Sequence, residues 1–432
     1  MSEHGDDDKV VDLASAKKRK KKDHIPHNGW PAELLSDGET FKIINIAGNV
    51  ARAFRFAPDL KGALALNEMS GQIEVRRPLP TIAAGAARPA GRGIDDTDAI
   101  LLTEWIQMEA HWFNLTTKMV QEGIVAAAAE NRFHPVRNYL DALVWDGKAR
   151  VPGWMATYLG ARREPYENTV GLMWLVSAVA RIYQPGCQCD YLPVFEGEQG
   201  LGKSTALKIL GGEWFTDAMP HDLSSKDASI SLRGKWIIEI AEMASMSRAD
   251  SNALKAYITR RQEDYRPPFG RYNVTEPRQS VFAGTINPTA DGYLKDSTGA
   301  RRFWPVKVSR LATGALERDR DQLWAEAVHH YRSGVRWWPE ADFERRVFAP
   351  EQEQRRQADA WAGPVLEYIA NRSEATLVAI GEEALGLIRS RIGKAEQGRI
   401  TEILTAEGWR RGRLETGTRR QLFVPPPKSA KR

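Results

Sequence analysis

Cysteine is scarce in this sequence, and long apolar runs are absent. The chain has two cysteines in 432 residues, Cys187 and Cys189. Two cysteines cannot form the disulfide framework of small secreted proteins, so we expect a reducing, cytoplasmic location. The most apolar helix-like stretch, Asn168 to Ala180, has 13 residues without a charged side chain, whereas a membrane span needs about 20. No apolar core follows the charged N-terminus, so neither a secretory signal nor a membrane partner is expected.

The surplus of positive charge is also small. Lys plus Arg is 61 and Asp plus Glu is 56, which leaves a net charge of +5. Residues 1–27 have little to bury, because acidic Asp6 to Asp8 are followed by basic Lys17 to Lys22. This composition predicts a disordered basic tail. The tail is either simply solvated or makes loose contacts with nucleic-acid phosphates.

The pattern of apolar residues divides the rest of the chain into four regions. Residues 28–150 have a mixed α and β pattern, including a short strand predicted at Phe41 to Ile46. Residues 151–315 form the next region, in which short apolar runs alternate with helix-like segments between about Asp190 and Val308. That alternation predicts a parallel sheet with crossover helices. A helical segment follows at residues 316–372.

The last region, residues 373–432, is small and basic. A helix predicted at Gly398 to Gly408 precedes two strands predicted between Trp409 and Val424. A helix followed by a basic hairpin is typical of winged-helix DNA-binding modules. A plain structural cap is the alternative.

The strongest signal is a glycine-rich loop, Gly197 to Ser204, with the sequence GEQGLGKS. Its spacing fits the P-loop pattern, and it lies between a strand predicted at Tyr191 to Phe195 and a helix that starts near Thr205. We therefore predict ATP and Mg²⁺ as cofactors, although a chance glycine-rich turn would have the same letters. The predicted ATP-binding residues are Gly197, Glu198, Gln199, Gly200, Leu201, Gly202, Lys203, Ser204 and Thr205.

The spacing follows from the chemistry of a phosphate chain. Glycines let the loop turn its amide N–H groups inward, and the following helix directs its positive end at the same anion. Lys203 would reach the β and γ phosphates, and the Ser204 hydroxyl would bind Mg²⁺.

Hydrolysis needs a carboxylate on a second strand, and Lys235 to Glu242 (KWIIEIAE) is an apolar run with two acids near its end. Glu239 and Glu242 are three residues apart, so they point to opposite faces unless the strand ends between them. We expect Glu242 to face Mg²⁺ and the attacking water, because it follows the apolar run. Both acids could instead be ordinary surface residues.

Two further groups of polar residues complete the predicted site. Asn287 follows a strand predicted at Ser280 to Ile286 and could contact the γ-phosphate, although Asn-Pro is also a common turn. Arg301 and Arg302 lie on a loop before the next apolar run. Arginine stabilises charge on a transferring phosphoryl group and is often supplied by a neighbouring subunit. A solvated arginine pair is the alternative.

Together these segments resemble the virulence-associated protein E family, P-loop ATPases of phages, plasmids and genomic islands that are similar to superfamily 3 helicases. The matching stretches are Phe133 to Leu140, Trp145 to Gly147, Gly197 to Ser204, Gly234 to Glu242, Leu254 to Thr259, Asp264 to Arg271, Gly284 to Asn287 and Asp296 to Trp304.

The resemblance implies an α/β fold with an AAA+-like core and assigns roles within it. Lys203 and Ser204 bind phosphate and Mg²⁺, and Glu242, with Glu239 beside it, polarises water. Asn287 senses the γ-phosphate, and Arg301 or Arg302 enters the site of a neighbour. The resemblance therefore implies a homo-oligomeric ring, which we expect to be a hexamer.

In such helicases the segment before the sensor strand faces the central channel. The basic residues of that segment are Lys255, Arg260, Arg261, Arg266 and Arg271. Aromatic Tyr265, Phe269 and Tyr272 are interleaved with them, which suits single-stranded or forked DNA because rings stack on bases. A solvated charged segment is the alternative.

We therefore predict an ATP-hydrolysing DNA helicase or translocase that serves replication of a mobile element. The region before the glycine-rich loop has no clear set of catalytic carboxylates, so priming is expected from a separate primase. The alternatives are an ATPase switch that binds nucleic acid or a partner without unwinding, and a non-catalytic protein that interferes with phage replication.

Overall fold

The computed structural model describes residues 29–40, 42–83, 87–220, 222–223, 225–243, 248–266, 272–287, 293–294, 300–355, 359–412 and 422–426. The chain forms two compact units, Met1–Asn138 and Tyr139–Arg432. The tail predicted at residues 1–27 lies outside the described residues.

The first unit packs three helices against a small sheet with the strand order β3-β2-β1-β4. Its elements are η1 (Trp30–Glu33), α1 (Ala47–Phe56), β1 (Leu64–Asn67), β2 (Ile73–Val75), β3 (Arg92–Gly93), α2 (Asp96–Glu109), α3 (Thr117–Glu130) and β4 (Arg132–Phe133). Asp95 caps α2, since its side chain accepts a hydrogen bond from the Asp98 N–H. Val50, Phe54 and Ile106 lie in a core of this unit, so it has a hydrophobic core of its own.

The strand predicted at Phe41 to Ile46 is wrong. Within the described residues 42–46, a single bridge joins Ile43 to Ser36. The buried Asn49 side chain donates to the carbonyls of Leu35 and Ile44, at 2.8 and 2.9 Å. These contacts use carbonyl groups that a longer strand ladder would need.

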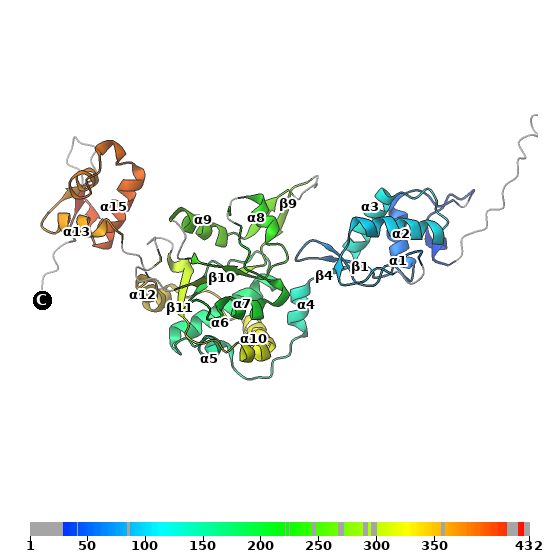
Figure 1. Ribbon diagram of the computed structural model, residues 1–432, viewed down its shortest axis with the longest axis horizontal. Coiled ribbons are helices and arrows are strands. Elements are labelled where there is room, and N and C mark those ends of the chain that lie inside the picture. Colours follow the sequence, from blue (N-terminus) through cyan, green and yellow to red (C-terminus); the bar gives the residue numbers. More distant parts are fainter. Residues whose placement is uncertain are drawn as a thin grey trace, which may run out of the picture. The chain divides into compact units, whose positions relative to one another are not determined.

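The second unit contains a five-stranded parallel sheet with the order β11-β5-β10-β7-β6. Its strands are β5 (Leu192–Glu196), β6 (Phe215–Thr216), β7 (Ile237–Ile240), β10 (Val281–Ile286) and β11 (Phe303–Lys307). Two of these strands, β10 and β11, are labelled in Figure 1. Every residue of β5, β7 and β10 is buried, as expected for strands covered on both faces. The predicted mixed α/β fold with a parallel sheet is confirmed.

Helices cover both faces of this sheet. On one face, α6 (Pro165–Tyr183), α7 (Lys203–Gly211) and α10 (Thr313–Arg332) pack together. On the other face, α8 (Lys226–Ser231) and α9 (Arg248–Ile258) form a core with Ile238 and Ile240 of β7. Since strand side chains alternate, the remaining β7 residues, Ile237 and Glu239, face α7.

The other elements of the second unit are short. They are α4 (Pro135–Ala142, which begins in the first unit), η2 (Val151–Gly153), α5 (Trp154–Leu159), η3 (Gly212–Trp214), the antiparallel hairpin of β8 (Gln262–Tyr265) and β9 (Val274–Pro277), η5 (Ala300–Arg302), α11 (Ala341–Phe343), η6 (Glu344–Phe348) and α12 (Ala349–Glu353).

The C-terminal segment has a small core of its own that includes Ile369, Ile400 and Phe423. Its strands have the order β12-β14-β13, and both pairings are antiparallel. Its elements are α13 (Ala362–Ile369), β12 (Ala375–Thr376), α14 (Leu377–Ala379), η7 (Ile380–Ala384), η8 (Arg389–Arg391), α15 (Lys394–Ala406), β13 (Arg410–Arg411) and β14 (Leu422–Val424).

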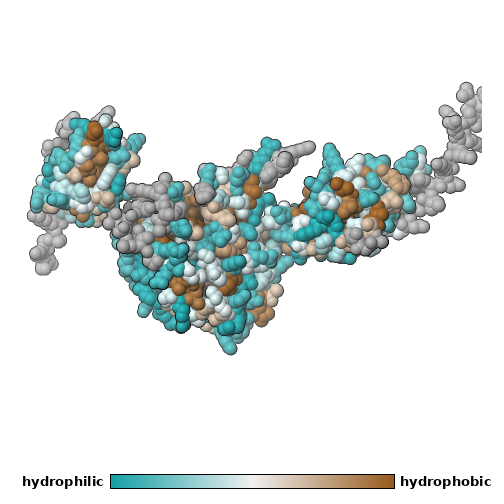
Figure 2. Space-filling view, in the orientation of Figure 1, coloured by the Kyte–Doolittle hydropathy of each residue, from teal (hydrophilic) through white to brown (hydrophobic). Residues whose placement is uncertain are grey.

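Hydrophilic side chains cover most of the surface seen in Figure 2, with apolar residues between them. Large exposed apolar side chains such as Val144 occur in both units. Among the described helices, none has both the length and the apolar character that crossing a membrane requires.

Candidate functional site

The glycine-rich loop joins the end of β5 to the start of α7, at the carboxyl edge of the parallel sheet. Gly200 and Gly202 have φ values of 78° and 94°, which are strained for residues with a side chain. At Gly197 an added Cβ would lie 2.8 Å from the Val308 carbonyl oxygen. Glycine at these positions therefore permits both the turn and the close approach of the chain after β11.

The Lys203 ammonium lies inside the loop. Its Nζ donates to the carbonyl oxygens of Gly197 and Glu198, at 2.6 and 2.8 Å, and to Asn287 Oδ1 at 3.3 Å. Burial lowers the pKa of Lys203, while the negative charge of Glu239 acts in the opposite direction. The ammonium therefore bridges the loop and the end of β10.

Glu239 of β7 is fully buried and contacts the first turn of α7. Its Oε1 accepts hydrogen bonds from Ser204 Oγ at 2.7 Å and from Thr285 Oγ1 at 2.6 Å. The strand register pairs Glu239 with Ala283. Thr285 lies two residues farther along β10, so its side chain is on the same face of the sheet as that of Ala283. These contacts hold the Glu239 carboxylate beside Ser204, the serine predicted to bind Mg²⁺.

Glu242 follows β7, which ends at Ile240, between the two acids. Glu242 has a φ of 52°, an uncommon value for a residue with a side chain. The chain therefore turns after the strand, and Glu242 lines the same cavity as Glu239. In the structure Ser204 therefore contacts Glu239, whereas Glu242 lies elsewhere on the cavity wall.

A cavity of about 380 Å³, here called the loop cavity, brings most of the predicted site residues together. It is lined by Gln199, Gly200, Leu201, Gly202, Lys203, Ser204, Thr205, Glu239, Ala241, Glu242, Thr285, Ile286 and Asn287. Gly197 and Glu198, the other predicted ATP-binding residues, line a second cavity that shares Leu201 and Ile286 with the first.

The fit of a divalent cation can be tested on Glu239. Its Oε2 is buried and has no hydrogen-bond partner among the residues that the structure describes. A buried carboxylate oxygen without a partner is costly unless a cation or donor satisfies it. In the same part of the chain, no group of three or more His, Cys, Asp or Glu side chains could hold a metal. The residues suit Mg²⁺, which is commonly bound through one or two carboxylates plus substrate phosphates.

Comparison with known protein families identifies the second unit. Residues 140–358, more than half of the chain, match the virulence-associated protein E-like domain. The chain belongs to this family. The match confirms the family resemblance deduced from the sequence motifs, and it spans the whole parallel sheet and both cavities.

Solved structures with a weak overall likeness come from the C-terminal region of NrS-1. One apo structure has a TM-score of 0.43 and 12% identity, and covers 81% of this chain and 84% of its own. An A-form apo structure has a TM-score of 0.39 and 15% identity, and covers 67% and 78% of the two chains. No curated protein matches the chain.

Arg301 and Arg302 of this family member lie away from the loop cavity. They form the end of η5, directly before β11, and the first residue of β11 pairs with the first residue of β5. Both arginines are therefore at the amino edge of the sheet, whereas the loop follows the carboxyl end of β5. Within one chain, the structure does not bring these guanidinium groups to the site.

The predicted nucleic-acid-binding residues have different surroundings. Lys255 of α9 is buried, and Arg260 is half-buried, with Nη2 3.3 Å from the Leu223 carbonyl oxygen. Arg261 and Arg266 are exposed, although Arg261 Nε donates to the Gly186 carbonyl at 2.9 Å. Arg271 lies outside the described residues. The described basic side chains therefore do not all share one exposed face.

Three residues that position the site were not predicted from the sequence motifs. Thr285 holds Glu239, and Arg355 forms an ion pair with Glu196, the last residue before the glycine-rich loop, at 3.0 Å. The polar Thr285 within the apolar β10 was a usable signal. No local pattern could have paired Arg355 with Glu196, because they are 159 residues apart.

Proposed function

We propose that the chain is a Mg²⁺-dependent ATPase that assembles into a ring and moves along nucleic acid, as a helicase or translocase, during replication of a phage or other mobile element. The observation that carries this proposal is the contact of Ser204 with Glu239 in the cavity that Lys203 and Asn287 also line. The strand order supports an AAA+-like P-loop core, since β7 and β10 both end at the cavity.

In the proposed ATP hydrolysis, the residues of the loop cavity would have different roles. Amides of the glycine-rich loop, the amino end of α7 and the Lys203 ammonium would bind the phosphates. Ser204 and Glu239 would hold Mg²⁺, which neutralises charge that develops on the phosphates. Glu242 would orient the attacking water, and Asn287 would contact the γ-phosphate. This proposal assigns the metal carboxylate to Glu239 because Glu239 contacts Ser204.

The location of Arg301 and Arg302 supports a site shared between neighbouring subunits. A guanidinium at the amino edge of one sheet can complete the cavity of another subunit, which requires a ring such as a hexamer. We expect mixing of wild-type chains with the Arg301→Ala, Arg302→Ala double variant to lower ATP turnover below the weighted mean of the two pure samples. The measurement is the turnover rate at a series of mixing ratios. A linear dependence on the wild-type fraction would contradict action between subunits.

Nucleic acid as the partner is supported by the β8–β9 hairpin. Arg266 at its outer end and the nearby Tyr272 are exposed, the latter to 81%. A cation and an aromatic ring together suit a single strand. In the C-terminal segment, Arg410 and Arg411 are exposed on β13, and the helices with the β12-β14-β13 sheet support a winged-helix module. Priming would come from a separate primase.

The test of the proposed function is the ATPase rate with and without single-stranded DNA. We expect stimulation by several-fold or more, and we expect the stimulation to weaken as salt rises, because phosphate contacts release counterions. The rate should be measured alongside the mass of the assembly with nucleotide. Turnover that no DNA or RNA changes would favour a switch that acts on a protein partner.

A further inference from the structure

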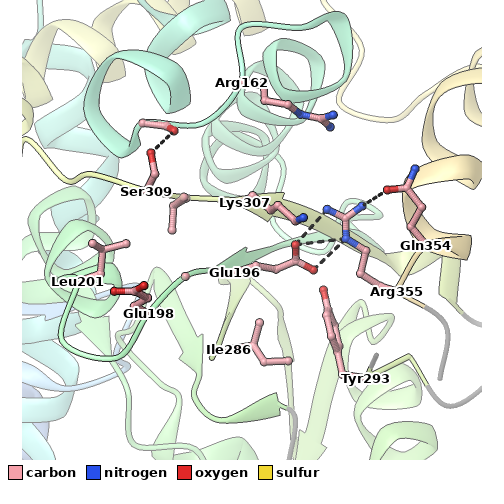
Figure 3. A pocket seen from close by; sticks show the side chains of 13 residues that line it. Arg162, Glu196, Glu198, Leu201, Ile286, Tyr293, Lys307, Ser309, Gln354 and Arg355 are labelled. Carbon is pink, nitrogen blue, oxygen red and sulfur yellow. Dashed lines mark hydrogen bonds and ion pairs between the residues drawn. The ribbon is translucent and has the colours of Figure 1, made fainter. Parts of the chain in front are cut away.

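A second cavity, of about 730 Å³, lies against the glycine-rich loop (Figure 3). It shares Leu201 and Ile286 with the loop cavity, and Gly197 and Glu198 of the loop also line it. We call it the side cavity. Its volume falls in the range of pockets that bind small molecules. The side cavity and the loop cavity are therefore neighbours that share part of their walls.

The lining combines apolar surface with a few polar groups. Leu201, Ile286 and Val308 supply the apolar surface. Ser309 Oγ donates to the Gly160 carbonyl at 2.8 Å, and the Gln354 amide oxygen accepts from Arg355 Nη1 at 3.3 Å. Because Arg355 uses the amide oxygen, the amide nitrogen of Gln354 is the group that can donate to a ligand. Apolar surface with a few polar groups suits a flat heterocycle.

Two of the cations that line the side cavity, Arg162 and Arg355, are paired within the protein. Arg355 binds Glu196 through Nε and Nη2, both at 3.0 Å, with both side chains more than 90% buried, and it also pairs with Glu351. Arg162 pairs with Glu167 at 2.8 Å and with Glu351 at 2.7 Å. These two cations are already neutralised by carboxylates. Apart from the paired Glu196, the other charged residues of the lining have opposite signs and are Glu198 and Lys307. The cavity therefore favours an uncharged polar group over a second polyanion.

The wall of the side cavity is joined closely to the loop. An added Cβ on Gly160 would lie 2.7 Å from Ser309 Oγ, so this glycine allows the two segments to touch. The Ser309 N–H donates to the Leu159 carbonyl at 3.2 Å, and the Ala312 N–H donates to the Tyr158 carbonyl at 2.8 Å. These backbone hydrogen bonds hold the segment after β11 against the end of α5, and the Val308 N–H donates to the Glu196 carbonyl, directly before the loop, at 2.8 Å. The cavity is therefore largely preformed.

We propose that the side cavity binds the base and ribose of the nucleotide whose triphosphate lies in the glycine-rich loop; this inference rests on the proposed function. Leu201 and Val308 contact the faces of the base, and Ser309 and Gln354 bind its polar edge or the ribose. The ion pairs of Arg355 hold Gln354 in place. The side cavity then distinguishes a nucleoside triphosphate from a bare triphosphate, and one base from another.

The experiment compares ATP with inorganic tripolyphosphate as ligands of the full chain, both with Mg²⁺, by isothermal titration calorimetry. Wild-type protein should bind ATP more tightly than tripolyphosphate. Ser309→Trp fills the side cavity, so it should weaken ATP binding about 10-fold or more, which corresponds to about 1.4 kcal/mol. The same variant should leave tripolyphosphate binding unchanged. Ser333→Trp, at an exposed serine after α10, is the matched control and should bind both ligands as wild type does.

The outcomes separate the two proposals. Equal wild-type affinities for ATP and tripolyphosphate, or an unchanged ATP affinity in folded Ser309→Trp, would overturn the side cavity as the nucleoside site and leave the ATPase proposal standing. A wild-type chain that binds neither ligand would overturn both. If Ser309→Trp does not fold, Gln354→Ala decides the question. It should weaken binding of ATP relative to tripolyphosphate, and an unchanged ratio of these two affinities would overturn the assignment.

Discussion

Replacing Lys203 with alanine is expected to lower ATP turnover by on the order of 100-fold or more, the size of effect seen when one charged or hydrogen-bonding group is lost from a preorganised site. The physical reason is the location of the ammonium, which contacts the glycine-rich loop and Asn287. With a triphosphate bound, that positive charge would lie against the β and γ phosphates. The measurement is phosphate release at saturating ATP and Mg²⁺.

Lys208→Ala is the matched control for this prediction. Lys208 lies on the same helix, α7, in its last turn, and its side chain is exposed. Loss of Lys208 should leave turnover within about twofold, because surface charges of this kind contribute little. Wild-type turnover in the Lys203→Ala variant would remove the ATPase proposal altogether.

The second large effect is expected for Glu239→Gln, which keeps the shape of the side chain and removes its charge. Turnover should again fall by on the order of 100-fold, and the Mg²⁺ concentration needed for half-maximal rate should rise. The buried Oε2 of Glu239 has no hydrogen-bond partner among the described residues, and Oε1 accepts from Ser204. A neutral amide at this position would bind a divalent cation more weakly. The measurement is a Mg²⁺ titration at fixed ATP.

Glu242→Gln makes the same chemical change at the other acid. Glu242 lines the cavity beyond the end of β7, so its loss should lower turnover without raising the Mg²⁺ requirement. The two variants therefore separate metal binding from orientation of water. A raised Mg²⁺ requirement in Glu242→Gln alone would transfer the metal role to Glu242.

Much of the fold was predictable because its signals are local. The apolar run before Gly197 predicted β5, and the loop spacing predicted that a helix starts at its end. The cap of α2, in which the Asp95 side chain accepts from the Asp98 N–H, is likewise a local contact. The strand predicted at Phe41 to Ile46 was wrong because the side chain of Asn49, five residues after Ile44, hydrogen-bonds to the carbonyl groups of Ile44 and Leu35. Strand propensity does not take account of a side chain that competes for the backbone in this way.

The site was predictable as a set of residues but not as a set of contacts. From the sequence we expected Glu242, rather than Glu239, to face Mg²⁺, but the choice depends on where β7 ends. The tertiary structure ends the strand at Ile240 and turns Glu239 toward α7. Likewise, the basic residues before β10 were evident in the sequence, but burial of Lys255 depends on how α9 packs.

The sequence by itself determined the family, the parallel α/β architecture and the glycine-rich loop, because each depends on residue types at short, regular spacing. Only the tertiary structure decided which carboxylate meets Ser204, where Arg301 and Arg302 lie relative to the loop, and that a side cavity adjoins it. Those features depend on strand order and register, which bring residues more than 100 positions apart, such as Glu196 and Arg355, into contact. No local pattern specifies contacts across such distances, since they form only when the whole sheet is assembled.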